Sequence, residues 1–251
     1  MTNVFFSRAL LAGFVLAGSA FFCASATAQY TSELGIGIGA TNYRGDVSPK
    51  YQLQNNRPAF TVFYRKDISV PVTLRAGLTA GLLRADDGNV NGVDGAVPPL
   101  QTFRQVNTKG SVYELSGALE YNFLDYHRRT DKVHFTPYVF VGLAIYYANT
   151  TTATNNQALA NAFNQQGSTL GLSIPGGVGI KLALSDHINL GLETGVRPTF
   201  SDDLDHLSEQ TTVLVDPNTK DWYYYSGVSL SYTFYSILCP THYRNNTELL
   251  R

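Results

Sequence analysis

Apolar side chains recur at every second position along this sequence, and this period restricts the chain to β-structure. Between residues 72 and 82 the even positions are apolar, whereas the odd positions hold threonine, arginine and glycine. Successive side chains of a strand point to opposite faces, so the pattern predicts a strand with one apolar face. The pattern indicates eight strands, at 33–41, 59–65, 72–82, 113–123, 138–147, 169–182, 188–197 and 222–234. The fifth is apolar on both faces, which leaves its phase open.

The polar faces of these strands carry mostly glycine, serine and alanine with isolated charges, which suits the confined interior of a narrow barrel. A strand facing bulk water would be rich in lysine, glutamate and threonine, whereas charged residues make up only 15% of this chain. Leucine, isoleucine and valine occupy the middle of the apolar faces, and aromatic residues lie toward the strand ends. We therefore predict an all-β fold, an eight-stranded antiparallel transmembrane β-barrel of the outer membrane.

The connections between the strands alternate in length, as they do in outer-membrane barrels. Long loops are expected near 42–55, 84–109, 149–167 and 201–220, and shorter links at 66–71, 124–134 and 185–186. Long loops are extracellular in such barrels, so both termini are predicted to be periplasmic.

The amino terminus has the order of a secretory signal peptide. Arg8 precedes an apolar stretch at 9–22, and a small-x-small site ends at Ala28, so cleavage is expected between Ala28 and Gln29. Phe22 disfavours a lipoprotein acylated on Cys23. No later run reaches the ~20 apolar residues of a membrane helix. The expected division is a signal peptide at 1–28, a barrel at 29–235 and a periplasmic tail at 236–251.

Several other functions lack support in the sequence. A formal charge of −1 excludes the basic footprint of a nucleic-acid binder. The glycine alternation at 35–39 continues as strand rather than helix, so it is not a phosphate-binding turn. The acidic residues at 202–209 lack the order of a calcium loop and are interpreted as a solvated loop. No histidine spacing indicates a metal site, and no cofactor is expected.

Charged residues of both signs fall on the predicted inner face. Paired carboxylates can perform acid–base catalysis, but mixed charges in so narrow a barrel more simply fill the lumen as a network of ion pairs. Such a network argues against a conducting pore. Its predicted members are Glu33, Arg75, Glu114, Glu120, Lys181, Glu193 and Arg197, with Arg65 near a strand end.

An ordered series of short motifs resembles the PorG-like outer-membrane barrel family of Bacteroidota, members of which belong to the type IX secretion system. The series comprises ELG at 33–35, NYRGD at 42–46, RP at 57–58, FYR at 63–65, LRAG at 74–77, EYNFLDY at 120–126, FTPYVF at 135–140, ETGVRPTF at 193–200, DLD at 203–205, DWY at 221–223 and CP at 239–240.

This resemblance implies a non-enzymatic secretion component that ties the periplasmic ring, formed by a lipoprotein and its ring partner, to the outer membrane and its lipid. In gliding species the same system supports motility. Two other classes stay open: an adhesin or other structural barrel, and a lipid-modifying enzyme, for which no convergent serine, histidine and acid is apparent. A small-solute channel is disfavoured by the charged lumen.

Cys239 is the single cysteine expected after signal cleavage, and it follows the last predicted strand. An odd cysteine in an exported protein indicates an intermolecular disulfide or a free thiol. The turn holding His127, Arg128, Arg129 and Lys132 is expected at the same periplasmic face. We therefore predict that this turn and the tail dock a periplasmic partner, through a disulfide to Cys239 or, alternatively, with the thiol packed against the barrel rim.

Overall fold

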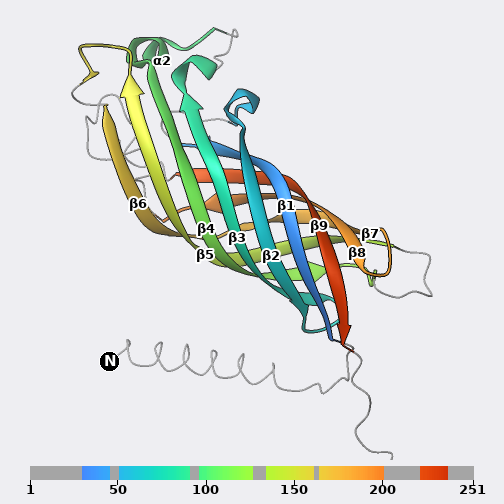
Figure 1. Ribbon diagram of the computed structural model, residues 1–251. Helices are drawn as coiled ribbons and strands as arrows, with labels where there is room; N and C mark the ends of the chain where they lie inside the picture. Colours follow the sequence, from blue (N-terminus) through green and yellow to red (C-terminus); the bar gives the residue numbers. More distant parts are fainter. Residues whose placement is uncertain are drawn as a thin grey trace, which may run out of the picture.

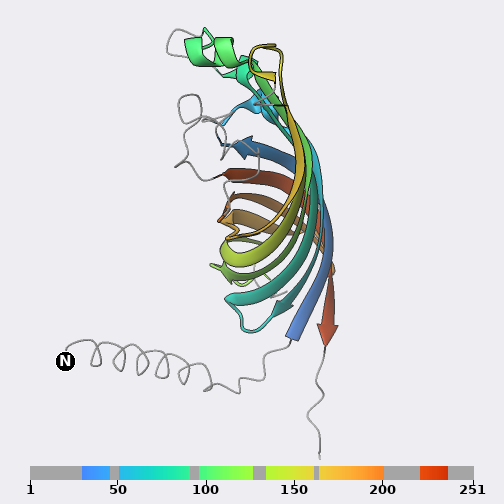
Figure 2. The same cartoon turned by 90° about the vertical axis from the view of Figure 1, so that its left-hand side faces the viewer.

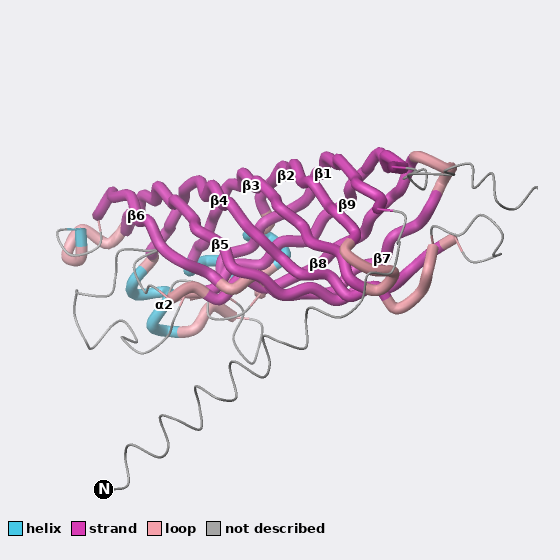
Figure 3. The backbone as a smooth tube through the Cα atoms, turned by 90° about the horizontal axis from the view of Figure 1, so that it is seen from below, coloured by secondary structure: helices cyan, strands magenta, loops and turns pink. Residues whose placement is uncertain are grey.

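The computed structural model describes residues 30–45, 51–90, 96–126, 134–160, 164–200 and 221–236. Strands form most of this part of the chain, with short helical segments between them (Figures 1 and 3). The strands are β1 (Tyr30–Arg44), β2 (Arg57–Asp67), β3 (Val72–Asp86), β4 (Val106–Asn122), β5 (Phe135–Thr154), β6 (Gln165–Ser173), β7 (Gly176–Ala183), β8 (Ile188–Pro198) and β9 (Trp222–Ser236). The helical segments are η2 (Leu53–Asn55), η3 (Asp87–Asn89) and α2 (Pro99–Arg104).

The strands form one antiparallel sheet that closes on itself. Its order is β4-β3-β2-β1-β9-β8-β7-β5-β6, and pairing of β4 with β5 completes the ring. β6 and β7 act as one strand, because both pair with β5 in a single register that runs from Ala144↔Ser173 to Val141↔Gly176. Pro175 lies between them and has no N–H to donate, which interrupts the ladder. The prediction of an eight-stranded antiparallel barrel is confirmed.

The two ends of the barrel differ. Tyr30 of β1 pairs with Ser236 of β9, so the described chain starts and stops at one end, called here the termini end (Figure 1). The tight β2–β3 and β7–β8 connections also lie there. The strand ends that flank the connections at 45–56, 87–105, 155–164 and 199–221 lie at the opposite loop end, whereas the connection at 123–134, as long as that at 45–56, joins β4 to β5 at the termini end.

Strands β3 to β6 rise above the other strands at the loop end and form a raised wall (Figures 1 and 2). The β3–β4 ladder continues to Asp86↔Asn107, and the β4–β5 ladder to Val106↔Thr154. The loops expected at 84–109 and 149–167 are therefore shorter than predicted. The outward-facing residues of the β3–β4 flanks are polar, namely Arg84, Asp86, Asn107 and Lys109, so the apolar outer face ends there although the backbone ladder continues.

A buried ion pair holds the β3–β4 connection. Arg104, at the end of α2, donates from Nε and Nη2 to the two carboxylate oxygens of Asp87, at 2.9 and 2.7 Å. Asp87 also accepts from the Val106 backbone N–H at 2.8 Å. A bidentate pair of this kind fixes geometry as well as charge, so the loop is anchored at both of its ends.

The interior has two layers. Toward the loop end it is an apolar core formed by Tyr43, Leu83, Ala85, Val106, Val112, Tyr146, Ala148 and Tyr223. Toward the termini end it is polar and charged. The phase of β5, open in the sequence, is decided by this packing: Tyr138, Phe140 and Tyr146 are buried inside, whereas Leu143 is 71% exposed outside.

Candidate functional site: the charged lumen and the apolar exterior

The exterior of the barrel is an apolar belt. Side chains such as Ile38, Leu78, Leu143 and Leu170 are 59–72% exposed although they are strongly hydrophobic. Exposed aromatic residues lie toward the termini end, among them Tyr64, Tyr121, Phe123, Phe135, Tyr232 and Phe234. A contiguous apolar surface of this extent is unfavourable in water, but it matches the hydrocarbon of a bilayer with an aromatic girdle at its edge.

Glu120 lies at the centre of the charged lumen. Its carboxylate is 3.0 Å from Arg65 Nε, 3.1 Å from Arg75 Nη1 and 2.6 Å from Lys181 Nζ. Arg75 also pairs with Glu193, which accepts a hydrogen bond from the Tyr138 hydroxyl at 2.8 Å. One carboxylate therefore holds together three cations that come from different strands.

A second group of charges lies closer to the loop end. Arg197 Nε donates to Glu114 at 3.0 Å, and the Tyr223 hydroxyl donates to the same carboxylate. The Arg197 guanidinium also lies over the Tyr225 ring, 4.9 Å from its centre. Each charge of this pair thus has a second favourable contact, as burial of a charge requires.

Glu33 joins the network to the termini end of the barrel. It lies 3.5 Å from Arg65 Nη1 and accepts a 2.6 Å hydrogen bond from the Tyr126 hydroxyl. Tyr126 belongs to the connection after β4, so this connection folds back into the end of the lumen. Burial, and next the negative charge of Glu33, raise the pKa of the Tyr126 phenol well above its usual value near 10. The phenol therefore remains a hydrogen-bond donor at neutral pH.

The network balances in charge and leaves little room. The carboxylates of Glu33, Glu114, Glu120 and Glu193 face the cations of Arg65, Arg75, Lys181 and Arg197. The void among Arg65, Arg75, Glu193 and Arg197 has a volume of about 20 Å³, which is close to the space that one water molecule needs. This layer therefore blocks the lumen rather than lining a passage through it.

The structure brings together all seven lumen residues proposed from the sequence. The sequence predicted Arg65 only near a strand end, whereas it lies in the middle of the network. Tyr126, Tyr138 and Tyr223 also belong to the network and were not predicted as lumen residues. Strand parity places Tyr223 on the inner face and could have identified it. Tyr138 was hidden by the open phase of β5, and Tyr126 lies beyond a strand end, where parity gives no information.

The other predicted site residues lie outside the described residues. These are the cleavage pair Ala28 and Gln29, the turn residues His127, Arg128, Arg129 and Lys132, and Cys239. The acidic loop residues Asp202, Asp203, Asp205 and Glu209 are also outside. Within the described ranges, no cluster of three or more His, Cys, Asp or Glu side chains could hold a metal ion. In the same ranges, no helix is long and apolar enough to cross a membrane.

A family model described as a domain of unknown function, DUF6089, matches residues 13–242. The chain belongs to the DUF6089 family. No curated protein matches this DUF6089 chain by sequence.

Solved structures similar to this DUF6089 member share little sequence with it. A major outer membrane protein of Thermus thermophilus is 16% identical, with a TM-score of 0.47 over 81% of this chain and 99% of that one. Ail of Yersinia pestis, in complex with a heparin analogue, is 13% identical, with a TM-score of 0.44 over 82% and 99%. Neisserial surface protein A is 8% identical, with a TM-score of 0.44 over 82% and 96%.

Proposed function

We propose that this chain is a non-enzymatic barrel of the bacterial outer membrane that anchors the periplasmic ring of the type IX secretion and gliding machinery. The observation that carries the anchoring role is the filled lumen, in which balanced ion pairs and an apolar layer occupy the space that a channel needs. The apolar belt supports membrane insertion. The assignment to type IX secretion is supported by the ordered motifs that resemble the PorG-like family.

The docking surface in this proposal lies at the termini end, which is assigned to the periplasm. Tyr126 inserts into the lumen, and the His134 carbonyl accepts from the Ala183 N–H at 2.7 Å. These contacts hold both flanks of the turn that carries His127, Arg128, Arg129 and Lys132. Since β9 also ends at this side, we propose that the turn and the tail with Cys239 together dock the periplasmic ring, formed by a lipoprotein and its ring partner.

Deletion of the gene in its native host tests this role. Cargo proteins with the carboxy-terminal secretion signal are expected to remain in the periplasm, and re-expression of the chain is expected to restore their export. A tagged chain isolated from crosslinked membranes is expected to retain ring proteins. The proposal would be contradicted if the deletion strain exported cargo normally and the isolated tagged chain retained no ring proteins.

The disulfide to Cys239 is tested separately on non-reducing gels of native membranes. The wild type is expected to give a band heavier than the monomer that disappears in Cys239→Ser. A monomer-sized band in both samples would remove the covalent link and leave a non-covalent dock.

A role in recognition at the cell surface is a second candidate, favoured by the exposed apolar side chains at the loop end. Leu53 of η2 is 75% exposed, and Leu100 and Phe103 of α2 are 42% and 55% exposed. The double variant Leu100→Ser/Phe103→Ser is expected to weaken adhesion without changing cargo export if this role is correct. Unchanged adhesion would exclude α2 from such a role.

A further inference from the structure

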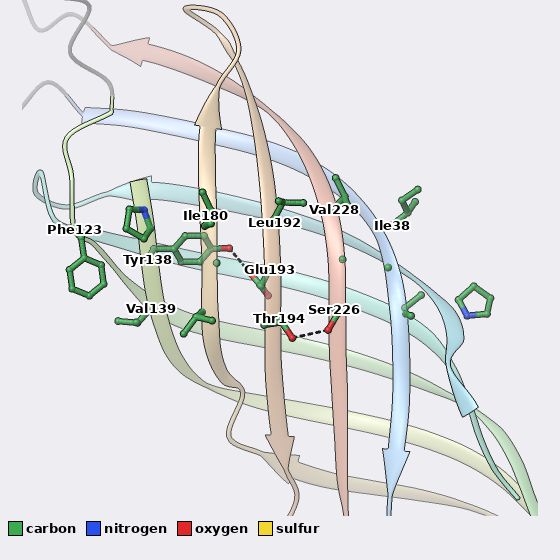
Figure 4. A pocket seen from close by; sticks show the side chains of 18 residues that line it. Ile38, Phe123, Tyr138, Val139, Ile180, Leu192, Glu193, Thr194, Ser226 and Val228 are labelled. Atoms are coloured by element: carbon green, nitrogen blue, oxygen red, sulfur yellow. Dashed lines mark hydrogen bonds between the residues drawn. The ribbon is translucent and has the colours of Figure 1, made fainter. Parts of the chain in front are cut away.

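Strand β6 forms an edge of the raised wall at the loop end (Figures 1 and 2). It pairs with β5 along its whole length, but on its other side the described chain meets it only near its end, where the Phe200 N–H donates to the Leu172 carbonyl at 3.1 Å. By contrast, β8 lies between two strands, and a hydrogen bond between Thr194 and Ser226 joins it to β9 (Figure 4). Residues 165–171 of β6 are therefore paired on one side only within the described part of the chain.

The parity of the ladder decides which backbone groups point away from β5. In an antiparallel pair, the N–H and C=O groups of one residue point to one neighbour, and those of the next residue point to the opposite side. Leu172 accepts from Phe200 on the side away from β5, so the backbones of Gln166, Ser168 and Leu170 point the same way. All three residues are exposed, and their backbone groups on that side pair with no described residue. They form an open row of N–H donors and C=O acceptors.

This open row begins where the apolar belt ends. Toward the loop end, the outward-facing pairs of β5 and β6 change from Tyr147↔Leu170 to Asn149↔Ser168. The backbone beyond Leu170 therefore lies outside the hydrocarbon of the membrane. Unpaired backbone groups are not tolerated in hydrocarbon, whereas in water they are solvated until a partner replaces the water.

The row lacks the residues that commonly protect a free edge strand from pairing. Such edges are often protected by lysine or proline, whereas residues 165–171 read QQGSTLG and contain no charge and no proline. The neighbouring strand β5 is also uncharged between residues 144 and 154. The ligand that this edge fits is an uncharged, extended polypeptide, because only a second backbone completes the ladder.

Two other occupants fit the edge poorly. A second copy in the same membrane is related by an axis along the membrane normal, so two β6 edges tilted by about 40° would cross at about 80° and form no ladder. Continuation of the chain beyond Phe200 in the same register would set Asp202 beside Leu170, and aspartate is depleted in strands. These arguments favour a segment of another protein.

We propose that residues 166–170 of β6 bind an extended, uncharged segment of another protein at the cell surface, as a strand added to the raised wall. Main-chain hydrogen bonds to the open row supply the affinity. Leu170, which is 72% exposed, favours an apolar side chain beside it on the added strand. The proposal rests on the membrane placement stated above, with the loop end outside the cell, but not on a role in secretion.

Amide hydrogen exchange, followed by NMR on the full chain in phospholipid nanodiscs, tests whether the row is open. The amides of Gln166, Ser168 and Leu170 are expected to exchange fast, whereas those of Gly167 and Thr169, which face β5, are expected to be protected. The probe ligand is a peptide that copies residues 145–154 of β5, a strand that already pairs with β6. Its addition is expected to protect the three edge amides.

A proline on the edge tests the role of the backbone. Ser168→Pro removes one N–H of the open row and leaves the ladder with β5 intact, because that N–H points away from β5. We expect it to weaken peptide binding about tenfold, measured by fluorescence anisotropy, since a peptide carbonyl loses its donor. Asn149→Ala changes an exposed side chain beside the edge and is expected to bind as the wild type does. If Ser168→Pro does not fold, Gln166→Pro makes the same change at another edge position.

The protected amides of Gly167 and Thr169 show whether each variant keeps its ladder with β5. The proposal is overturned if the three edge amides are protected without peptide, because the chain itself or a second copy then covers the edge. It is also overturned if the wild type does not bind the peptide, or if Ser168→Pro binds it as tightly as the wild type. Since the nanodiscs contain no secretion proteins, these results leave the anchoring role unaffected, whereas failure of the wild type to insert would contradict the membrane placement as well.

Discussion

At the scale of single residues, the stability of the interior depends on buried charges that pair with one another, because water does not solvate them there. Glu120 is 1% exposed and contacts Arg65, Arg75 and Lys181. Desolvation of this carboxylate is offset by three close cations, and each cation depends on it in turn. Removal of one member is therefore expected to lower the free energy of unfolding strongly, because it leaves the remaining charges buried without a partner.

Replacement of Glu120 by glutamine tests this dependence. Glu120→Gln preserves shape but removes the shared counter-charge, so we expect a loss of about 3–5 kcal/mol in the free energy of unfolding. The measurement is urea unfolding in vesicles. Lys109→Gln, which removes a charge from an exposed position on β4, is the control and should change the free energy of unfolding little.

Cargo export in Glu120→Gln should fall only as far as the abundance of the barrel falls. Normal folding and abundance with lost export would indicate a catalytic or gating role.

Leu78 and Thr79 test which face of β3 meets the lipid. Leu78 is 59% exposed on the exterior, whereas Thr79 is buried inside. Leu78→Arg is expected to cost about 2–4 kcal/mol if the site lies near the middle of the bilayer. Thr79→Arg instead crowds the lumen. If Leu78→Arg is tolerated as well as a substitution in a loop, the assignment of the lipid-facing side is wrong.

Tyr126 predicts a dependence on alkaline pH. Its pKa is higher in the folded state than in the unfolded chain, so the stability that it contributes is present below about pH 10 and is lost as pH rises through the folded-state pKa. Tyr126→Phe removes the hydrogen bond to Glu33. The difference in unfolding free energy between wild type and Tyr126→Phe should therefore shrink above pH 10. A difference that stays constant up to pH 12 would show that the phenol is not coupled to folding.

At the scale of elements, the close approach of β4 and β5 depends on a glycine in β5. Gly142 of β5 faces the interior, and a Cβ there would lie 2.2 Å from the Gly117 backbone oxygen and 2.8 Å from Ala118 Cα. Backbone atoms cannot move aside as a flexible side chain does. At Gly117 of β4, no atom lies within 4 Å of an added Cβ.

This pair of glycines provides a matched test of the β4–β5 seam. Gly142→Ala is expected to lower the unfolding free energy by about 1–3 kcal/mol through overpacking. Gly117→Ala should be neutral or slightly stabilising, because it reduces the freedom of the unfolded chain. Both are measured by the same urea unfolding in vesicles. Equal effects of the two substitutions would contradict the close contact between the strands.

At the scale of the whole molecule, the filled interior predicts a barrel that does not conduct. The purified wild type in a planar bilayer is expected to show no steady conductance steps, because ion pairs and the apolar layer block the lumen in series. A large porin serves as the positive control in the same bilayer. Steady ion flow through the wild type would show that the blocking layers open, and the anchor proposal would then lose its main support.

The sequence by itself determined the number of strands and, for seven of the eight, which face meets the lipid. The reason is that the bilayer requires apolar side chains at outward-facing positions, whereas the narrow lumen requires small or polar ones at inward-facing positions. This alternation recurs along the chain. The inner face also identified Glu120, Arg75 and Lys181 as residues that need partners, because charges in a confined space must be paired.

Only the tertiary structure decided which charge meets which. Closure of the ring sets the register, and register brings Arg75 and Glu193, 118 residues apart, into contact. The same closure turned the aromatic side chains of β5 inward beside the cations, although both faces of that segment are apolar. It also aligned Ala40, Ser226 and Thr194 into one exterior row. These arrangements depend on the relative shift of neighbouring strands, whereas alternation within a strand records only which side each residue faces.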